Sequence, residues 1–378
     1  MRMMVTGATG YVGSRLVTAL LAHDHDVVVA SRNTARLTDF GWFPDVSAVR
    51  LDAGDADSVR DAFGKAGDID VVYYLLHGIG EPGFREADNR AATNLATAAR
   101  DAGVQRVVYL GGFVPDDDTL SDHLAGRAEV AHALSVDGGP EVVWLGAAMI
   151  IGAGSTSFEI LRYVADRFPV MPLPSWLSNP MDPISIRDVL HYLVAAADTD
   201  KVPAGAYDIC GPETTTYRGV LAAYSRLAGK RRFGVPVCGV ATGLASRVSA
   251  VALPVPDGLT ADLTVSLEYP MTADGDGIRH VVPDPPGGLL GVDDAIRRAL
   301  AGGRRKPVNM LPDPHHLADT DPVWAGGDPA RLRQLAGAVL PSVTRPALAL
   351  LGLLPGPVAG AVRTGLDTMI GLVPKGAR

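Results

Sequence analysis

The chain has 378 residues, of which 47% are hydrophobic and 20% are charged, and its net charge at neutral pH is −8. This balance is typical of a globular protein with a large core, and the length predicts two or three domains. The acidic net charge argues against nucleic acid as a partner, and Cys210 and Cys238 indicate neither a disulfide framework nor a metal site. The N-terminus lacks the pattern of a signal peptide, so a reducing cytoplasm is the expected location.

The first fifteen residues read MRMMVTGATGYVGSR. A short apolar run ends at Thr6, glycines follow at Gly7, Gly10 and Gly13, and an amphipathic helical pattern comes next. In such a pattern the first glycine permits a tight turn, the second admits a pyrophosphate, and the third lets the helix pack on the strand. The order of strand, turn and helix therefore predicts a dinucleotide site, with a plain strand-to-helix turn as the alternative.

The end of the next predicted strand, residues 26–30, decides which cofactor is favoured. NAD-binding proteins usually place an acidic residue there, whereas this chain places Ser31 and Arg32, with Arg36 one turn further on. A guanidinium group can bind a 2′-phosphate through two hydrogen bonds, so NADP(H) is the expected cofactor. The alternative is that Arg32 is only a solvated loop residue.

Further strands are expected at 46–51, 70–76, 104–110 and 142–151, with helices at 84–102 and 158–167 between and after them. Ligands bind at the carboxyl ends of parallel strands. Asp52, His77 and Gly111 follow three of these strands and are candidate site residues, although a turn or structural role explains His77 equally well. The class is α/β, and residues 1–167 are expected to form a doubly wound parallel sheet, the Rossmann fold.

Residues 168–300 are rich in proline, with short elements that include a helix ending near 197, a strand at 206–210 and a helix at 217–228. We expect a smaller substrate lobe in which some elements return to the Rossmann sheet. Trp176 and Met181 suit a pocket wall, and core packing is the alternative for each.

Residues 301–378 are expected to form a loop-rich extension, which contains the segment DPVWAGG at 321–327, and an apolar helical tail. The uncharged stretch 346–362 is divided by Pro355 and Pro357, so it is too short and too broken to span a membrane as a helix. We expect two short helices that dock on the body. A homodimer or a membrane-surface contact through 335–374 is the alternative.

The segment TGATGYVG, at 6–13, resembles the glycine motif of extended and atypical short-chain dehydrogenases/reductases. With YYLLHGIG, YLGGF, HLAGRAEVAHAL and PISIRDVLHYLV it resembles an atypical group, which is related to NmrA-like proteins and to the NADPH-binding accessory subunit of respiratory complex I. The resemblance covers about residues 1–300. The cofactor contacts that it and the strand ends imply are Thr6, Gly7, Thr9, Gly10, Tyr11, Val12, Gly13, Ser31, Arg32, Asp52, Leu76, His77, Gly111 and Arg127.

Classical members of that superfamily use a serine, a tyrosine and a lysine. The serine position here holds Gly111 and Gly112, the tyrosine position resembles His123, and the lysine position resembles Arg127. His123 could supply a proton near neutral pH, and Arg127 could hold an oxygen of the cofactor but is a poor acid. His77 is the third catalytic candidate. In the alternative, His123 lies on the surface and Arg127 pairs with Glu129 or Asp122.

These patterns favour an NADPH-dependent reductase of a small, mostly apolar carbonyl or enone compound, because the cofactor itself carries the hydride. Two alternatives remain open. One is a non-catalytic NADPH-binding sensor or assembly protein, which is the role that the complex I resemblance implies. The other is a redox-neutral cyclase or isomerase on the same fold.

Overall fold

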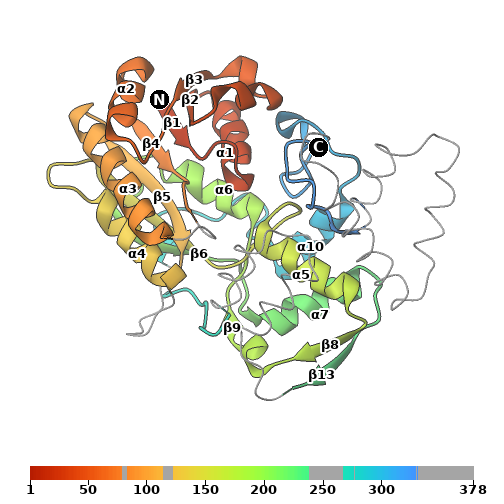
Figure 1. Ribbon diagram of the computed structural model, residues 1–378. Helices are drawn as coiled ribbons and strands as arrows, with labels where there is room; N and C mark the ends of the chain where they lie inside the picture. Colours follow the sequence, from red (N-terminus) through yellow and green to blue (C-terminus); the bar gives the residue numbers. More distant parts are fainter. Residues whose placement is uncertain (79–82, 114–121, 238–266, 276, 329, 331–378) are drawn as a thin grey trace, which may run out of the picture.

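The computed structural model describes residues 1–78, 83–113, 122–237, 267–275, 277–328 and 330 (Figure 1). Its central sheet is built from β1 (Arg2–Thr6), β2 (Asp26–Ser31), β3 (Ser47–Arg50), β4 (Val71–Tyr74), β5 (Arg106–Gly112), β6 (Glu141–Ala147) and β11 (Gly205–Ile209). The strands are all parallel and lie in the order β11-β6-β5-β4-β1-β2-β3. The chain therefore winds outward in both directions from β1, and the predicted doubly wound α/β fold is confirmed.

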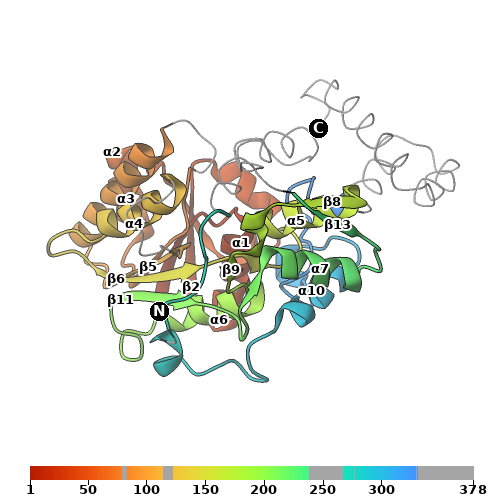
Figure 2. The same ribbon diagram turned by 90° about the horizontal axis from the view of Figure 1, so that it is seen from below.

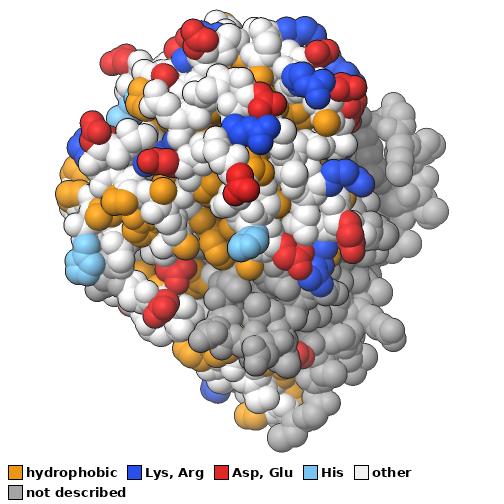
Figure 3. All heavy atoms as spheres, turned by 90° about the vertical axis from the view of Figure 1, so that its left-hand side faces the viewer, with side chains coloured by type: hydrophobic (Ala, Val, Ile, Leu, Met, Phe, Trp, Pro, Cys, Tyr) orange, Lys and Arg blue, Asp and Glu red, His pale blue; other side chains and the backbone are white. Residues whose placement is uncertain are grey.

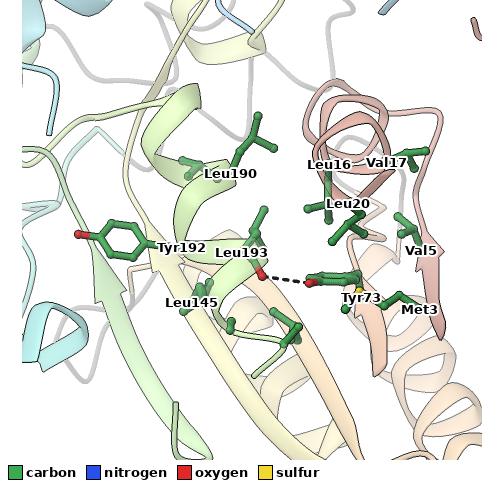
Figure 4. Close-up of a cluster of buried hydrophobic side chains, with 14 of the residues drawn as sticks. Met3, Val5, Leu16, Val17, Leu20, Tyr73, Leu145, Leu190, Tyr192 and Leu193 are labelled. Atoms are coloured by element: carbon green, nitrogen blue, oxygen red, sulfur yellow. Dashed lines mark hydrogen bonds between the residues drawn. The ribbon is translucent and has the colours of Figure 1, made fainter. Parts of the chain in front are cut away.

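Helices cover both faces of this sheet. The faces are covered by α1 (Tyr11–Ala22) and α6 (Ile186–Ala195) on one side and by α2 (Ala56–Ala66), α3 (Phe84–Asp101) and α4 (Asp122–Leu134) on the other (Figures 1 and 2). Apolar side chains of α1 and α6 meet over the middle strands, where the Tyr73 hydroxyl donates to the carbonyl oxygen of Leu193 at 3.0 Å (Figure 4). Burial on both faces explains why these strands are continuous apolar runs rather than alternating ones.

Two predicted strands are too long: the one expected at 70–76 is β4, which ends at Tyr74, and the other is the one expected at 142–151. The strand expected at 142–151 ends at Ala147, and Ile150–Ile151 form a separate strand, β7, which pairs with β10 (Ile184–Ser185). Ala147 pairs with Gly112 on one side and with Ile209 on the other, and both of these residues are the last of their strands. Since no neighbour extends further, β6 has no backbone partners beyond Ala147 and the chain leaves the sheet.

A smaller lobe with its own apolar core lies beside the carboxyl end of the sheet (Figure 1). It contains α5 (Thr156–Arg167), α7 (Tyr217–Leu227), α10 (Val292–Ala301), the parallel pair β8 (Val170–Leu173) and β13 (Phe233–Pro236), and the antiparallel pair β9 (Pro180–Met181) and β12 (Thr215–Thr216). Short 3-10 helices complete the described chain: η1 (Thr34–Asp39), η2 (Phe43–Asp45), η3 (Ser175–Ser178), η4 (Gly277–His280) and η5 (Val308–Met310).

The apolar tail at 335–374, with its proposed docking, dimer or membrane contacts, lies outside the described residues. Within the described part of the chain, no helix is both long and apolar enough to cross a membrane.

The loop-rich extension is joined to α1 by a buried ion pair. The two guanidinium nitrogens of Arg15 lie 3.0 and 2.7 Å from the carboxylate oxygens of Asp321, and both side chains are at most 3% exposed. Arg15 also donates to the carbonyl oxygens of Pro314 and His316 at 2.8 Å. A charge this deeply buried is tolerated only when its hydrogen-bonding capacity is used, and here residues 314–321 provide the partners.

The rest of the DPVWAGG segment is fastened to α5. The Glu159 carboxylate accepts hydrogen bonds from the backbone amides of Gly154, Gly326 and Gly327 at 2.9 to 3.1 Å. Tyr163 donates to the carbonyl oxygen of Trp324. These contacts make the segment a packed part of the body between α1 and α5.

The buried Arg15–Asp321 pair predicts that two aspartate variants differ strongly in how much stability they lose. Asp321→Ala would leave the Arg15 charge buried without its partner and should lower the free energy of unfolding by about 3–5 kcal/mol. Asp57→Ala is the control, because the Asp57–Arg60 pair is exposed and should contribute little. Urea unfolding followed by circular dichroism measures both, and equal losses in the two variants would contradict a structural role for Asp321.

Candidate functional site

The glycine turn after β1 has the geometry that its sequence predicts. Gly7 has a φ of +71°, and a Cβ atom there would lie 2.6 Å from the carbonyl oxygen of Leu75. A Cβ atom on Gly13 would lie 2.2 Å from the carbonyl oxygen of Gly7. Both positions therefore exclude every residue other than glycine, and they bring the start of α1 into backbone contact with the turn.

Gly10 is constrained differently. It is the N-cap residue of α1, and a Cβ atom on it would meet only the carbonyl oxygen of Gly7, at 3.3 Å. The protein alone does not require glycine here. A backbone without a side chain at the N-terminus of a helix is instead what the close approach of an anionic group needs, so the residues fit a dinucleotide pyrophosphate.

A cavity of about 900 Å³ extends from this turn into the smaller lobe. Most of the sequence-predicted site residues line it: Gly7, Thr9, Gly10, Tyr11, Val12, Gly13, His77, Gly111 and Arg127. The structure therefore brings together residues from the ends of three strands, β1, β4 and β5, with the start of α1 and one residue of α4. Their roles in binding stay predictions.

Thr6, Ser31, Arg32, Asp52 and Leu76 are not part of this lining. The Thr6 hydroxyl donates to the carbonyl oxygen of Tyr73 at 2.9 Å, so it ties β1 to β4. The Asp52 carboxylate accepts from the amide of Gly54 at 3.2 Å, next to α2. These contacts hold the framework around the cavity.

The two arginines after β2 are placed differently. Arg32 is exposed and outside the lining, whereas Arg36, on η1, is exposed and contributes to the cavity wall. Sequence spacing could not separate the two, because which one faces the cavity depends on the 3-10 turn that begins after Asn33 and is capped by its side chain.

His77 is exposed at the cavity wall, in the loop three residues beyond the end of β4. The next residue is held by α3, because the Asp88 carboxylate accepts a hydrogen bond from the amide of Gly78 at 2.9 Å. Burial raises the pKa of Asp88 above its usual range. The loop that carries His77 is thus fixed to a helix on one side.

Arg127 is half-buried on α4 and lines the cavity. Glu129, its suggested partner, binds elsewhere: the Glu129 carboxylate pairs with Arg85 and accepts from the Asn89 amide at 2.8 Å. Hydrogen bonding from Arg85 lowers the pKa of Glu129. The backbone of His123 belongs to α4, but its side chain, like that of Asp122, lies outside the described residues.

The structure explains the glycine at the expected serine position. A Cβ atom on Gly111 would lie 2.6 Å from the Trp144 indole nitrogen and 3.0 Å from the Tyr109 ring. The two rings lie 6.2 Å apart between their centroids and fill the space that a serine side chain would need. No hydroxyl can be placed at Gly111 without moving one of these rings.

Sequence reasoning missed the charged residues behind the cavity wall. The Arg15 guanidinium lies 4.0 Å from the centre of the Tyr11 ring, and the Tyr11 hydroxyl is buried against Gly152, where a Cβ atom would lie 2.1 Å away. Burial raises the pKa of Tyr11 above its usual range, so it stays protonated. The available signal was the spacing that places Arg15 and Glu159 beside the apolar residues of their helices, on the sides that are buried.

Residues 7–135 match a protein-family model described as NAD(P)H-binding. They form an NAD(P)H-binding domain. This match agrees with the dinucleotide site predicted from the glycine stretch, and a nicotinamide dinucleotide is the supported cofactor. The match does not distinguish NAD from NADP.

An uncharacterized protein of Mycobacterium tuberculosis is 27% identical over 226 residues, which are 60% of this chain and 23% of that protein. This chain therefore spans about a quarter of the length of that curated relative. Two solved structures share the fold. A nucleoside-diphosphate-sugar epimerase of Staphylococcus aureus superposes with a TM-score of 0.62 at 17% identity, over 79% of this chain and 100% of that one. A Citrobacter triphenylmethane reductase complexed with NADP(H) superposes with a TM-score of 0.60 at 18% identity, with the same coverage.

The environment of Gly10 predicts that its replacement weakens cofactor binding but leaves the fold intact. Gly10→Val should weaken NADPH and NADH binding by more than about tenfold, because the side chain would occupy the phosphate position. The thermal midpoint should change little, since only one protein atom lies nearby. Gly64→Val is the control, because nothing lies within 4 Å of a Cβ atom at this helical position. Fluorescence titration measures binding, and unchanged affinity in Gly10→Val would place the phosphates elsewhere.

Proposed function

We propose that the protein is an NADPH-dependent reductase of a small, mostly apolar carbonyl or enone compound, working without the Ser-Tyr-Lys set. The division of the cavity into a polar half and an apolar half carries this proposal. The polar half lies at the glycine turn, where Arg36, His77 and Arg127 contribute to the wall.

The half of the cavity inside the smaller lobe is apolar. Its wall is formed by Met149, Ile150, Ile160, Leu161, Val164, Phe168, Pro172, Pro174, Trp176, Leu177, Tyr217, Leu221, Leu267 and Met271. Beside this apolar wall the lining continues with Ser155, Thr156 and Ser157 at the start of α5 and with Asp321, whose carboxylate is already paired with Arg15. A substrate seated there gains from burying apolar surface, whereas a second charged group would lack a partner. This favours an apolar compound over a nucleoside-diphosphate sugar, although sugar epimerases are among the structural neighbours.

The cofactor assignment rests on the cations beside β2. We assign the principal 2′-phosphate contact to Arg36, because it reaches the cavity wall, and a secondary electrostatic role to Arg32. A carboxylate in this place would repel the phosphate. The likeness to a reductase complexed with NADP(H) is consistent with this choice.

When bound, NADPH supplies a hydride to a substrate carbon. Reduction of a carbonyl also needs a proton on oxygen, and reduction of an enone passes through a negatively charged oxygen before a proton reaches carbon. Arg127 keeps its charge at any physiological pH, so it suits stabilisation of that oxygen rather than proton transfer. His77 lines the cavity and can hold a transferable proton near neutral pH, and His123 remains the second proposed donor.

The alternatives differ in what happens to the cofactor. A redox-neutral isomerase or cyclase would turn over substrate without net change in NADPH. A sensor or assembly protein would bind NADPH without turnover.

Cofactor preference provides the first test of the proposal. The wild-type protein should bind NADPH more tightly than NADH, and Arg36→Ala should weaken NADPH binding about ten- to a hundredfold by removing a charge-assisted contact. NADH affinity should stay the same, and Arg32→Ala should have a smaller effect than Arg36→Ala. Calorimetric titration of all three proteins decides this. Equal affinities for the two cofactors in the wild type would exclude the assignment.

Reduction itself provides the second test. Incubation with NADPH and a panel of apolar ketones and enones should oxidise the cofactor and give a product heavier by two hydrogen atoms. Arg127→Ala should lower kcat by about 10²–10³-fold with the best substrate, as expected for loss of an oxyanion-stabilising group. Arg90→Ala, an exposed site on α3, is the control.

The pH dependence of kcat/KM in His77→Ala and His123→Ala would then show which histidine supplies the proton, because that variant alone loses the limb near neutral pH. Product formation without loss of NADPH would support the isomerase alternative. Binding without product across the whole panel would support the sensor.

A further inference from the structure

The pair β8 and β13, which we call the flap, projects from the smaller lobe (Figures 1 and 2). In its register Phe233 lies opposite Val170, and Val235 lies opposite Pro172. Side chains two residues apart share a face of a strand, so these four apolar residues lie on one face. Phe233 is 71% exposed, Val170 55% and Val235 46%. They make up half of the large hydrophobic residues that are exposed in the described chain.

This arrangement is unusual for a parallel pair. Parallel strands are normally covered on both faces, and two strands alone have little stability. Here the opposite face is packed only along β8, where Met171 is 6% exposed and Leu173 is half-buried, while Gly234 and Pro236 of β13 are exposed. The outward face is therefore an apolar surface that the described residues do not cover.

Basic residues adjoin the apolar face where β13 begins. Lys230, Arg231 and Arg232 directly precede Phe233. Lys230 pairs with Asp166 at 2.9 Å, and Arg232 donates to the carbonyl oxygen of Asp166 at 3.2 Å. Arg231 is exposed, and no ion pair involves it within the described chain. These three cations have one carboxylate, that of Asp166, beside them. This end of the flap is therefore positive, although the net charge of the protein is −8.

Another face of the molecule has a different distribution of charge. Over the face that carries α2, α3 and α4, acidic and basic side chains are interspersed (Figure 3). The flap instead joins one sign of charge to exposed aliphatic and aromatic side chains. That combination is typical of segments that rest on anionic lipid surfaces, where cations meet headgroups and apolar side chains enter the boundary below them.

We propose that the flap is a docking surface for an anionic lipid bilayer. The cavity reaches the same place, because Pro172 belongs both to the exposed face and to the cavity lining. An apolar compound dissolved in the bilayer would therefore meet the cavity without crossing water. Docking itself does not depend on the reaction proposed above.

Two features argue against a second copy of the chain as the occupant. A two-fold dimer would use the same patch on both copies, so the cations of each flap would meet no acidic patch on the other. A stable protein interface also involves about 20–30 residues on each side, far more than the flap offers. Weak and reversible attachment to a surface needs much less.

Vesicle binding by the full chain tests the proposal. The probe is vesicles of phosphatidylcholine and phosphatidylglycerol in equal parts, compared with phosphatidylcholine alone, in co-sedimentation at low and high salt. The wild type should bind the anionic vesicles more strongly, and salt should weaken the binding. The double variant Phe233→Ser, Val235→Ser and the charge reversal Arg231→Glu should each weaken binding by more than about tenfold.

Two variants away from the flap serve as matched controls. Met310→Ser removes a side chain that is 65% exposed on η5, and Lys65→Glu reverses an exposed charge on α2. Both should bind vesicles as the wild type does, and all variants should keep the wild-type thermal midpoint and NADPH affinity.

Three outcomes would overturn the proposal. The wild type would bind neither kind of vesicle. Alternatively, both flap variants would bind as well as the wild type, which would assign membrane contact to another segment such as 335–374. Or light scattering would show a dimer that the flap variants abolish, which would make a second copy the occupant.

Discussion

Contact between Gly13 and the carbonyl of Gly7 is the constraint on which the cofactor half of the molecule depends. No side chain separates α1 from the turn after β1, so the helix starts directly against the strand end. This fixes where the helix amides point and also where Arg15, two residues later, enters the interior. A single requirement for close backbone packing thus determines both the anion-binding end of the cavity and the attachment of its far wall.

The two ends of the cavity offer different interactions to a bound molecule. At the strand ends, backbone and a few cations offer hydrogen bonds and charge to a dinucleotide. In the smaller lobe, apolar side chains offer only exclusion of water. Between them, Trp144 and Tyr109 fill the space beside Gly111, whereas a Cβ atom on the adjacent Gly112 would lie 3.8 Å from the carbonyl oxygen of Ala147 and 3.9 Å from the Arg127 side chain. The expected serine position therefore presents backbone and an arginine stem rather than a hydroxyl.

Much of the fold could be predicted because the sequence signals were local. The glycine spacing, the apolar runs of buried strands and the helix patterns each report on neighbours along the chain, and the parallel sheet follows from their order. The premature end of β6 could not be predicted, because it is set by where β5 and β11 stop, at Gly112 and Ile209. The site divides in the same way. The glycine turn, His77 and Gly111, expected from local patterns, line the cavity, whereas Asp52 and Leu76 do not. The choice between Arg32 and Arg36 depends on a turn, and the burial of Arg15 depends on a partner 306 positions away.

That separation has a consequence for how the protein is made. α1 can form as soon as residue 22 has left the ribosome, but its guanidinium receives a counter-ion only after Asp321 has been synthesised. The same segment that supplies the counter-ion also supplies the carbonyl oxygens of Pro314 and His316, so the charge gains its partners and loses its contact with water in one step. Docking of residues 314–321 onto α1 is therefore expected to be a late step of folding, set by the long sequence separation of the two charges.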